Sequence, residues 1–490
     1  MKHSWLAKQI RLWVAQESNE DDPKNAILAQ ILTPCFKQNL AASGPLLLTV
    51  GTGVTVGYSA VLLPQLQTKN GGIPIDKDQE SWVAAMAALP MALGTLLGGL
   101  LTEKYGRRFT HVSTCLPTFA GWIIIYCARN VDMLLVGRFL TGLNAGILAP
   151  ATGVYIGETS EPRYRGFLLG GISLAISVGL LLVHVLGTFL HWKTAASVCS
   201  TIPILGWLLM LPTPESPPWL AKKGCSAGAE TSFRWLRGGS EESQRELDIM
   251  LTNQKNHVER NLTPKSFLVP EFLKPLGILT MLLVVSQWSG INAVNFYSVS
   301  LMKTAAGPGI DEYLATVFID VVRVAASVVA CLLIRKFDRR RLAVFGSLGT
   351  SIALFMLTAH IYLARFLRQS SSTLFFVPVV ALALYISFVA VAYVALPWTL
   401  LGELLPLTNR SVGSAVASCA AFLAMFSVVK TMPGMFDLLG ADGTFLVYGV
   451  IAFLGVGFVY LVLPETRGRT LSEIEVYFKG GATEYAESAA

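Results

Sequence analysis

Residues 287–298 read QWSGINAVNFYS and lie inside a run, residues 275–302, that contains no charged residue. About 20 apolar residues in a helix cross the hydrocarbon core of a bilayer, so this run is long enough to span a membrane. Buried amides such as those of Gln287 and Asn292 cost a few kcal/mol unless they are paired. Gly290 favours a break between them, and a broken helix is tolerated in a membrane where it lines a cavity. We therefore expect an interrupted span whose amides face either a hydroxyl-rich ligand or a neighbouring helix.

The whole chain is apolar. Its 490 residues are 53% hydrophobic and 14% charged, with a mean hydropathy of +0.55. Twelve hydrophobic runs fall six and six around a polar stretch, which predicts an all-α membrane protein of twelve transmembrane helices in two pseudo-symmetric six-helix bundles. The expected parts are an N-terminal segment (1–42), a first bundle (43–212), a linker with short helices (213–274), a second bundle (275–463) and a tail (464–490). Within the linker, Ser240 before Glu241 predicts a helix start.

The charges indicate an orientation. Loops assigned to the inside carry more Lys and Arg per loop than loops assigned to the outside, so we expect both termini in the cytoplasm. We also expect a multi-pass protein of the plasma membrane. The formal net charge of +7 is then explained by loops that face anionic lipid, and we expect no nucleic-acid partner. Residues 1–14 mix basic and apolar residues, which does not fit a cleaved signal peptide.

The sequence does not suggest an enzyme. The seven cysteines are an odd number without paired spacing, which predicts neither a disulfide framework nor a metal site. No nucleophile and base, metal-ligand cluster or phosphate-binding loop is recognisable. We therefore expect no cofactor, no bound metal and no catalytic residue.

Short charged motifs recur at matching places in the two halves of the sequence. EKYGRR at 103–108 follows the second hydrophobic run, and KFDRRR at 336–341 follows the eighth. Glu158 and Arg165 stand seven residues apart after the fourth run, as Glu403 and Arg410 do after the tenth. This register predicts related halves, and the spacing suggests that each Glu and Arg meet across a short loop.

Seven short motifs of the sequence resemble, in order, the signature motifs of the sugar porter family of the major facilitator superfamily. The resemblance covers about residues 43 to 476, and it is strongest to facilitated trehalose and glucose transporter-like members. It implies two six-helix bundles that give alternating access to a central site. The words are GRR at 106–108, GRFLTGLNAG at 137–146, YIGETSEPRYRG at 155–166, PESPPWL at 214–220, QWSGIN at 287–292, PWTLLGELLP at 397–406 and PETRGRTLSEIE at 464–475.

The resemblance also implies a substrate site. Gln287 and Asn292 match positions that hold the sugar in this family, and Trp398 matches a stacking residue, with simple packing as the alternative. Several family amides are replaced here, so a disaccharide or polyol suits the chain as well as a hexose. The candidate substrate-binding residues are Ser173, Ser286, Gln287, Asn292, Asn295, Arg323 and Trp398.

A gate on the cytoplasmic side is expected from the recurring charged words. We expect its residues to form ion-pair networks that join the bundles when that side is shut. They are Arg107, Arg108, Glu158, Arg165, Arg339, Arg340, Glu403 and Arg410. Ser59 stands where proton-driven family members carry an Asp, and a serine does not titrate near neutral pH, which predicts transport without proton coupling. His184 and His360 are isolated in the sequence, and we expect both to be packed or interfacial.

One polar stripe runs along the eighth hydrophobic run. Thr316, Asp320, Arg323 and Ser327 recur at helical spacing, so they share one face, and Asp320 and Arg323 are close enough to pair. Two interpretations stay open. Arg323 either holds the helix in place through Asp320 or reaches the substrate and helps to select it.

The predicted function is therefore transport of a sugar, trehalose or hexose, or of a related polyol by alternating access. The alternative is a sugar-binding sensor that does not transport. The expected partners are the small-molecule substrate and the lipid bilayer.

Overall fold

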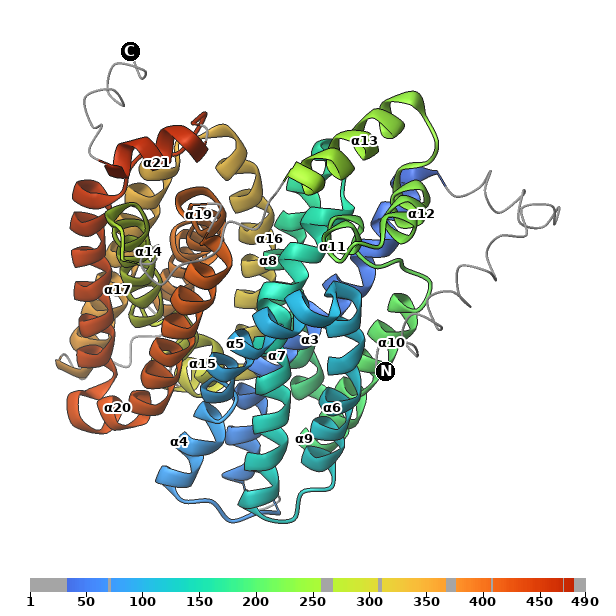
Figure 1. Ribbon diagram of the computed structural model, residues 1–490. Helices are drawn as coiled ribbons and strands as arrows, with labels where there is room; N and C mark the ends of the chain where they lie inside the picture. The colour runs from blue at the N-terminus through green and yellow to red at the C-terminus, as the bar shows by residue number, and fades with distance from the viewer. Residues whose placement is uncertain are drawn as a thin grey trace.

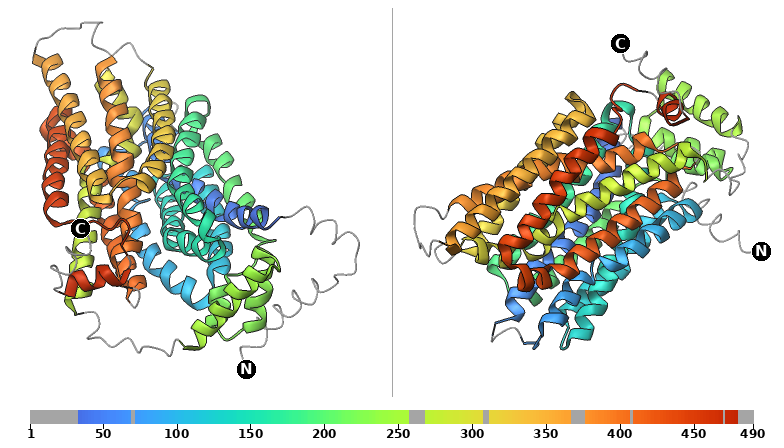
Figure 2. Two further views of the ribbon diagram at one scale, coloured as in Figure 1. Left: turned by 90° about the horizontal axis from the view of Figure 1, so that it is seen from above. Right: turned by 90° about the vertical axis from the view of Figure 1, so that its left-hand side faces the viewer.

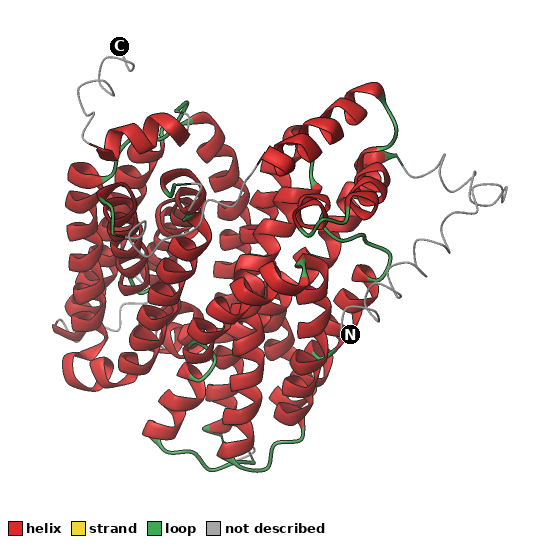
Figure 3. Ribbon diagram, in the orientation of Figure 1, coloured by secondary structure: helices red, strands yellow, loops and turns green. Residues whose placement is uncertain are grey.

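The computed structural model describes residues 33–68, 72–256, 268–306, 311–366, 376–406, 409–469 and 471–479. Within these ranges every regular element is a helix and there is no strand (Figure 3). Residues 1–32 of the expected N-terminal segment and residues 480–490 of the tail lie outside the described parts. The long helices form two groups, one from each half of the chain (Figure 1).

The first group contains the helices between residues 34 and 210. Its first helix begins at Pro34, earlier than the expected residue 43, with the Thr33 hydroxyl as its N-cap. The group consists of α3 (Pro34–Leu66), α4 (Lys77–Ala85), α5 (Leu89–Tyr105), α6 (Arg107–Tyr126), α7 (Val131–Thr159), α8 (Pro162–Phe189), α9 (Trp192–Cys199) and α10 (Thr201–Met210).

The second group contains the helices between residues 270 and 462. Its last helix is one long element that turns at Gly440, where φ is +75°, a value that glycine adopts without strain. The group consists of α14 (Pro270–Trp288), α15 (Ile291–Ala306), α16 (Glu312–Lys336), α17 (Arg339–Phe366), α18 (Phe376–Val389), the π-helical turn η2 (Ala390–Ala395), α19 (Leu396–Leu404) and α20 (Arg410–Val462).

Length and hydropathy make this a multi-pass membrane protein. Ten helical stretches of the described chain are long and apolar enough to cross a membrane. One of them, α20, has 53 residues and holds two segments on either side of Gly440, and α6 adds a further helix of 20 residues. Together they account for the twelve predicted spans in an all-α fold.

Short helices mark one end of the molecule. This end, the linker face, carries α11 (Pro217–Lys222), α12 (Ser226–Arg237), α13 (Glu241–Asn256) and α21 (Leu471–Lys479) (Figures 1 and 2). Ser240 caps α13 through its hydroxyl, which accepts from the Ser243 N–H at 3.2 Å, so the predicted helix start is confirmed. The other end, the opposite face, carries the start of α4 and the bend at Gly440.

Small residues let helices approach closely within each group. A Cβ on Gly142 of α7 would lie 2.2 Å from the Ala87 carbonyl oxygen, and one on Gly94 of α5 would lie 2.2 Å from that of Leu143. Between the groups, α8 packs against α16, α3 against α15, and α5 against α20. These three contacts place the middle of the membrane-spanning region, where the candidate site lies, between the two halves.

Candidate functional site

The seventh span is broken where the sequence predicts. Helix α14 ends at Trp288, Gly290 adopts φ +89°, and α15 begins at Ile291. A Cβ at Gly290 would lie 2.6 Å from the Tyr448 ring, so both its backbone conformation and its surroundings favour glycine. The break lets Gln287 and Asn292, which a continuous helix would point apart, turn toward each other.

The amides at this break form a chain of hydrogen bonds. Asn292 donates to the Gln287 side-chain oxygen, Asn295 donates to Asn292 over 3.1 Å, and Gln287 donates to the Ser286 hydroxyl over 3.2 Å. The Asn295 Oδ1 atom is buried and has no hydrogen-bond partner among the described residues. Linked amides that keep unused donors and acceptors suit a ligand that carries many hydroxyl groups.

The remaining predicted substrate residues lie on neighbouring spans. Trp398 follows the π-helical turn η2 and is 40% exposed, with its ring 6.2 Å from that of Phe422. Turns of π-helix often occur at functional sites. Ser173 is half-buried on α8, and its carbonyl accepts from the Ser177 hydroxyl over 3.0 Å.

Arg323 pairs with Asp320, as their spacing predicts. The Arg323 Nη1 and Asp320 Oδ1 atoms are 3.3 Å apart, and both side chains are buried. Both residues line a small pocket between α15, α16 and α18, together with Ser298. The Nε atom of Arg323 and the hydroxyl of Ser298 have no hydrogen-bond partner among the described residues. A buried arginine with an unused donor beside an unused hydroxyl is therefore available to a ligand.

His184 is packed, as expected, but it is not isolated from other polar groups in the fold. It lies buried on α8, where its Nδ1 atom forms a hydrogen bond with Asp320 Oδ2, and its Nε2 atom lies 3.2 Å from the Gly57 carbonyl oxygen. His184 and Asp320 are 136 positions apart in the sequence, and no local pattern connects them.

The charged residues of the repeated motifs lie at the linker face, where they form ion pairs within each half of the chain. Arg107 donates to both carboxylate oxygens of Glu158, over 2.8 and 2.9 Å, and Arg339 lies 3.2 Å from Glu403. The expected meeting of Glu158 with Arg165 is wrong. Arg165 instead donates to the Ser160 carbonyl over 3.3 Å, because that carbonyl is the nearer acceptor at the helix end. The Arg107–Glu158 and Arg339–Glu403 pairs therefore each lie within one half of the chain.

The other predicted gate residues contact backbone carbonyls. Arg108 donates to the carbonyls of Met210 and Leu211, and Arg340 donates to that of Tyr460. Arg410 donates to the Leu405 carbonyl over 3.3 Å. These contacts fix the ends of neighbouring helices on the linker face.

Two carboxylates at this face were missed by the sequence reasoning. Glu215 accepts from the backbone N–H groups of Arg107 and Arg108 at the start of α6, and Glu465 accepts from those of Arg339 and Arg340 at the start of α17. Burial raises the pKa of Glu215, although these N–H groups act to lower it. The shared Pro-Glu word at 214–215 and 464–465 is the signal that predicts such a pair.

The opposite face holds ion pairs of a different kind. Lys430 of α20 lies 2.7 Å from Asp78 of α4, and Lys77 lies 2.9 Å from Asp437. Lys430 also lies over the Trp82 ring at 4.4 Å. Each of these contacts joins the first group of helices to the second.

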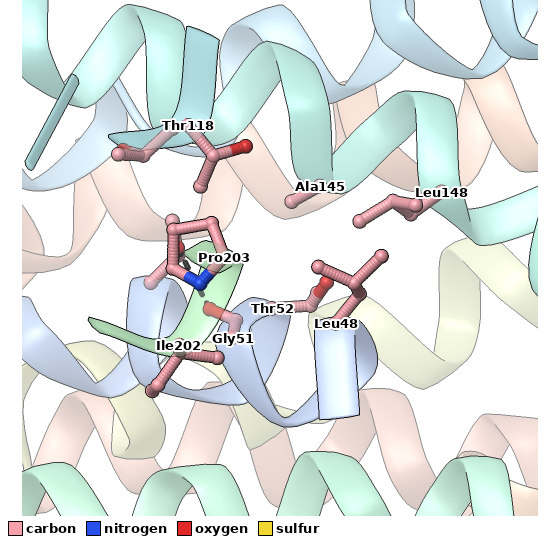
Figure 4. Close-up of a pocket in the computed structure, with 10 residues that line it drawn as sticks. Leu48, Gly51, Thr52, Thr118, Ala145, Leu148, Ile202 and Pro203 are labelled. Carbon is pink, nitrogen blue, oxygen red and sulfur yellow. Dashed lines mark hydrogen bonds between the residues drawn. The ribbon is translucent and has the colours of Figure 1, made fainter. Parts of the chain in front are cut away.

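A second small pocket lies within the first group, between α3, α6, α7 and α10. Figure 4 shows Leu48, Ala145, Leu148 and Pro203 around it. The Thr118 hydroxyl at this pocket donates to a carbonyl of its own helix, as those of Thr55 and Thr141 do. With these hydroxyls bonded to backbone, the pocket does not form part of the candidate site.

Two groups of six membrane-spanning helices, with a broken and amide-lined span in the second group, define a membrane transporter of the two-bundle class. Residues 40–478 match the family described as Sugar (and other) transporter, and the chain belongs to that family.

Curated relatives and solved structures agree with this assignment. The chain is 33% identical over 470 residues to the facilitated trehalose transporter Tret1 of Drosophila pseudoobscura pseudoobscura and 32% identical to trehalose transporter 1 of Drosophila melanogaster. Each alignment covers 94% of this chain and 54% of the relative, so the chain spans about half the length of the curated relatives it matches.

The fold is similar to that of the xylose transporter XylE from E. coli. Its proton:xylose symporter structure bound to 6-bromo-6-deoxy-D-glucose matches with a TM-score of 0.74 and 22% identity, over 90% of this chain and 100% of that one. An inward-open structure of the same transporter matches with a TM-score of 0.71 and 22% identity, over 88% and 98%. At these identities the likeness concerns the fold alone.

Proposed function

We propose that this chain carries a sugar or a related polyol across a membrane by alternating access. The observation that carries the proposal is the break at Gly290, which turns the amides of Gln287 and Asn292 toward each other inside a membrane-spanning region. Hydroxyl-rich ligands use both donors and acceptors, and the amide chain offers both. Family membership and the trehalose transporters among the relatives support a sugar as substrate.

The transport proposed here is facilitated diffusion without proton coupling. Buried Arg138 donates to the Ser59 hydroxyl and, over 2.7 Å, to the Thr55 carbonyl. At this arginine the chain therefore offers neutral acceptors, and a hydroxyl does not titrate near neutral pH. The structural likeness to a proton symporter supports the fold alone and gives no argument about proton coupling.

The orientation proposed here places the linker face in the cytoplasm and the protein in the plasma membrane. The basic words at 107–108 and 339–341 lie at this face, which agrees with the excess of Lys and Arg in cytoplasmic loops. When this face closes, we expect the charged residues around Glu158 and Glu403 to meet across the two halves and form the gate.

Arg323 is proposed as a substrate contact as well as a partner of Asp320. Its free Nε donor and the free Ser298 hydroxyl, both in the pocket beside α15, support this role. Arg323→Asn should change the ranking of trehalose, glucose and sorbitol as substrates by several-fold. If the variant only lowers the amount of protein and the ranking stays the same, Arg323 has a structural role alone.

Uptake of radiolabelled trehalose, glucose and sorbitol into proteoliposomes tests the proposed function. We expect at least one of the three to equilibrate across the membrane, at a rate that a protonophore does not change. Gln287→Ala should abolish most of this uptake, whereas Gln244→Ala, which removes a half-buried amide on the linker helix α13, should leave it intact. Binding without uptake would indicate a sensor, and accumulation above equilibrium that collapses with a protonophore would indicate coupling to protons.

A further inference from the structure

At the opposite face, one lysine of the second half contacts three groups of the first half. The Lys430 ammonium of α20 lies 2.7 Å from the Asp78 carboxylate and 2.6 Å from the Ser81 hydroxyl oxygen. It also lies over the Trp82 ring, 4.4 Å from the ring centre. An ammonium group is a compact charge with three N–H donors, and an aromatic face attracts a cation. Two oxygen atoms and one ring of the first half therefore surround the Lys430 ammonium.

The three groups form one unit on α4. Asp78, Ser81 and Trp82 stand at positions i, i+3 and i+4 of this helix, so their side chains share one face. The buried Ser81 hydroxyl donates to the Asp78 carbonyl over 2.7 Å. With its hydrogen used in this way, the hydroxyl offers only lone pairs to the ammonium. The first half therefore presents a carboxylate, an accepting hydroxyl and an aromatic ring together.

Contacts within the first half hold this unit in place. The Asp76 side chain accepts from the Gln79 N–H over 2.8 Å, and the Gln79 side chain accepts from the Asp76 N–H over 3.2 Å, which is a capping box at the start of α4. Gln67, which follows the end of α3, donates to the Glu80 carboxylate over 3.0 Å. None of these three contacts involves the second half, so the unit should keep its shape when the opposite face opens.

The second half presents the ammonium from a fixed position. Phe426 lies one helical turn before Lys430 on α20, and its ring is 6.0 Å from the Trp82 ring. The Val429 carbonyl, next to Lys430, accepts from the Tyr297 hydroxyl of α15 over 3.2 Å. The Lys430 side chain is only 22% exposed, and a cation over an aromatic ring is held more strongly when water is excluded. Lys430 is therefore positioned to move in and out of the α4 unit together with its own half.

We propose that Asp78, Ser81 and Trp82 form a preformed site for a primary ammonium group, which Lys430 occupies when the opposite face is closed. The inference rests on the alternating access of the proposed function, in which the two halves separate at this face. On separation Lys430 leaves with α20, and the vacant site accepts a small primary ammonium ion from solution. A ligand shifts a two-state equilibrium by its difference in affinity for the two states, so the tethered ammonium favours the closed face.

Chemical rescue tests the site. Thr68 and Leu438 are exposed at the opposite face, one in each half, and cysteines introduced there carry spin labels in a background without the seven native cysteines. In lipid nanodiscs without sugar, Lys430→Ala should lower the short-distance population several-fold. n-Propylammonium chloride, whose cation replaces the part of the side chain that was removed, should restore most of this population in a saturable way. n-Propanol, or sodium chloride at the same ionic strength, should not restore it.

Further variants separate the contributions to the site. Trp82→Leu, added to Lys430→Ala, should weaken the apparent affinity for n-propylammonium several-fold, because the ring contact is lost. Lys430→Met keeps the length of the side chain without its charge, so the short-distance population should be low and should not respond to n-propylammonium. This variant also covers the case in which Lys430→Ala does not fold. Lys77→Ala breaks an exposed pair of the same face outside the site and is the matched control, with an unchanged population.

The outcomes that contradict the proposal are distinct. A short-distance population in Lys430→Ala or Lys430→Met equal to that of the parent would overturn the role of Lys430. Recovery with n-propanol, or no recovery with n-propylammonium, would overturn the preformed ammonium site. Because these distances are measured without sugar, they do not depend on the substrate. Absence of sugar uptake by the parent protein in proteoliposomes would instead overturn the proposed function, so the two failures are distinguishable.

Discussion

The two faces of the molecule arrange their charged side chains in different ways. At the linker face, Arg107 pairs with Glu158 and Arg339 pairs with Glu403, so each pair lies within one half of the chain. At the opposite face, the Asp78–Lys430 contact joins the two halves. In the proposed alternating-access cycle, pairs within a half can persist throughout, whereas pairs between halves must break. The arrangement described here is therefore closed at the opposite face.

The largest effect is expected at the buried contact between the halves. Asp320→Asn leaves Arg323 buried and unpaired, and removing one partner of a buried pair costs roughly 3 to 5 kcal/mol. The variant should show a lower thermal unfolding midpoint and a lower yield of monodisperse protein. Ser327→Ala, about two helical turns from Asp320 along the same stripe, removes only a hydroxyl and should cost about 1 kcal/mol. Equal losses in the two variants would contradict a special role for Asp320.

Substitutions in the linker-face ion pairs are expected to cause the second-largest loss of stability. Glu158→Gln and Glu403→Gln each leave a mostly buried arginine without its carboxylate, which costs up to roughly 3 kcal/mol at these partly exposed sites. If these carboxylates also close the gate, the linker face should open more often in the two variants. A thiol reagent added on that side should then modify cysteines introduced near the pairs faster than in the parent protein. Glu241→Gln removes a fully exposed pair on α13 and is the matched control. Unchanged labelling in both variants would leave these pairs with a role in stability alone.

The smallest effect is expected at the opposite face. Asp78→Asn should weaken the closed state by at most about 1 kcal/mol, because the carboxylate is 78% exposed and solvent screens its charge. The change should be larger at low salt than at high salt. Lys77→Ala breaks a more exposed pair and should have no measurable effect on the distance between spin labels attached to cysteines introduced at the exposed positions of Thr68 and Leu438. A larger response to Lys77→Ala than to Asp78→Asn would reverse the order expected from burial.

Local patterns predicted the features whose partners are close in sequence. The break at Gly290 follows from a glycine among amides in an apolar run, and the Asp320–Arg323 pair follows from a helical spacing of three residues. The repeated charged words likewise indicated two related halves. The sugar porter resemblance, carried by motifs along most of the chain, indicated the family from the sequence alone.

Contacts between the halves could not be predicted from local sequence patterns. His184 meets Asp320 across 136 positions, and Lys430 meets Asp78 across 352. Periodicity shows which face of a helix is polar but does not show which helix that face meets. For the same reason, the pairing of Glu158 with Arg107 was missed in favour of a nearer arginine in the sequence.

A reversible cross-link tests most directly the claim that the opposite face must open in each cycle. Cysteines at positions 78 and 430, in a background without native cysteines, would be joined by a short thiosulfonate cross-linker and later released with a reductant. Transport should stop on cross-linking and recover on reduction. The same treatment of cysteines at positions 103 and 222, where Glu103 and Lys222 pair within the first half and its linker, should leave transport intact. Continued transport with positions 78 and 430 joined would contradict the account.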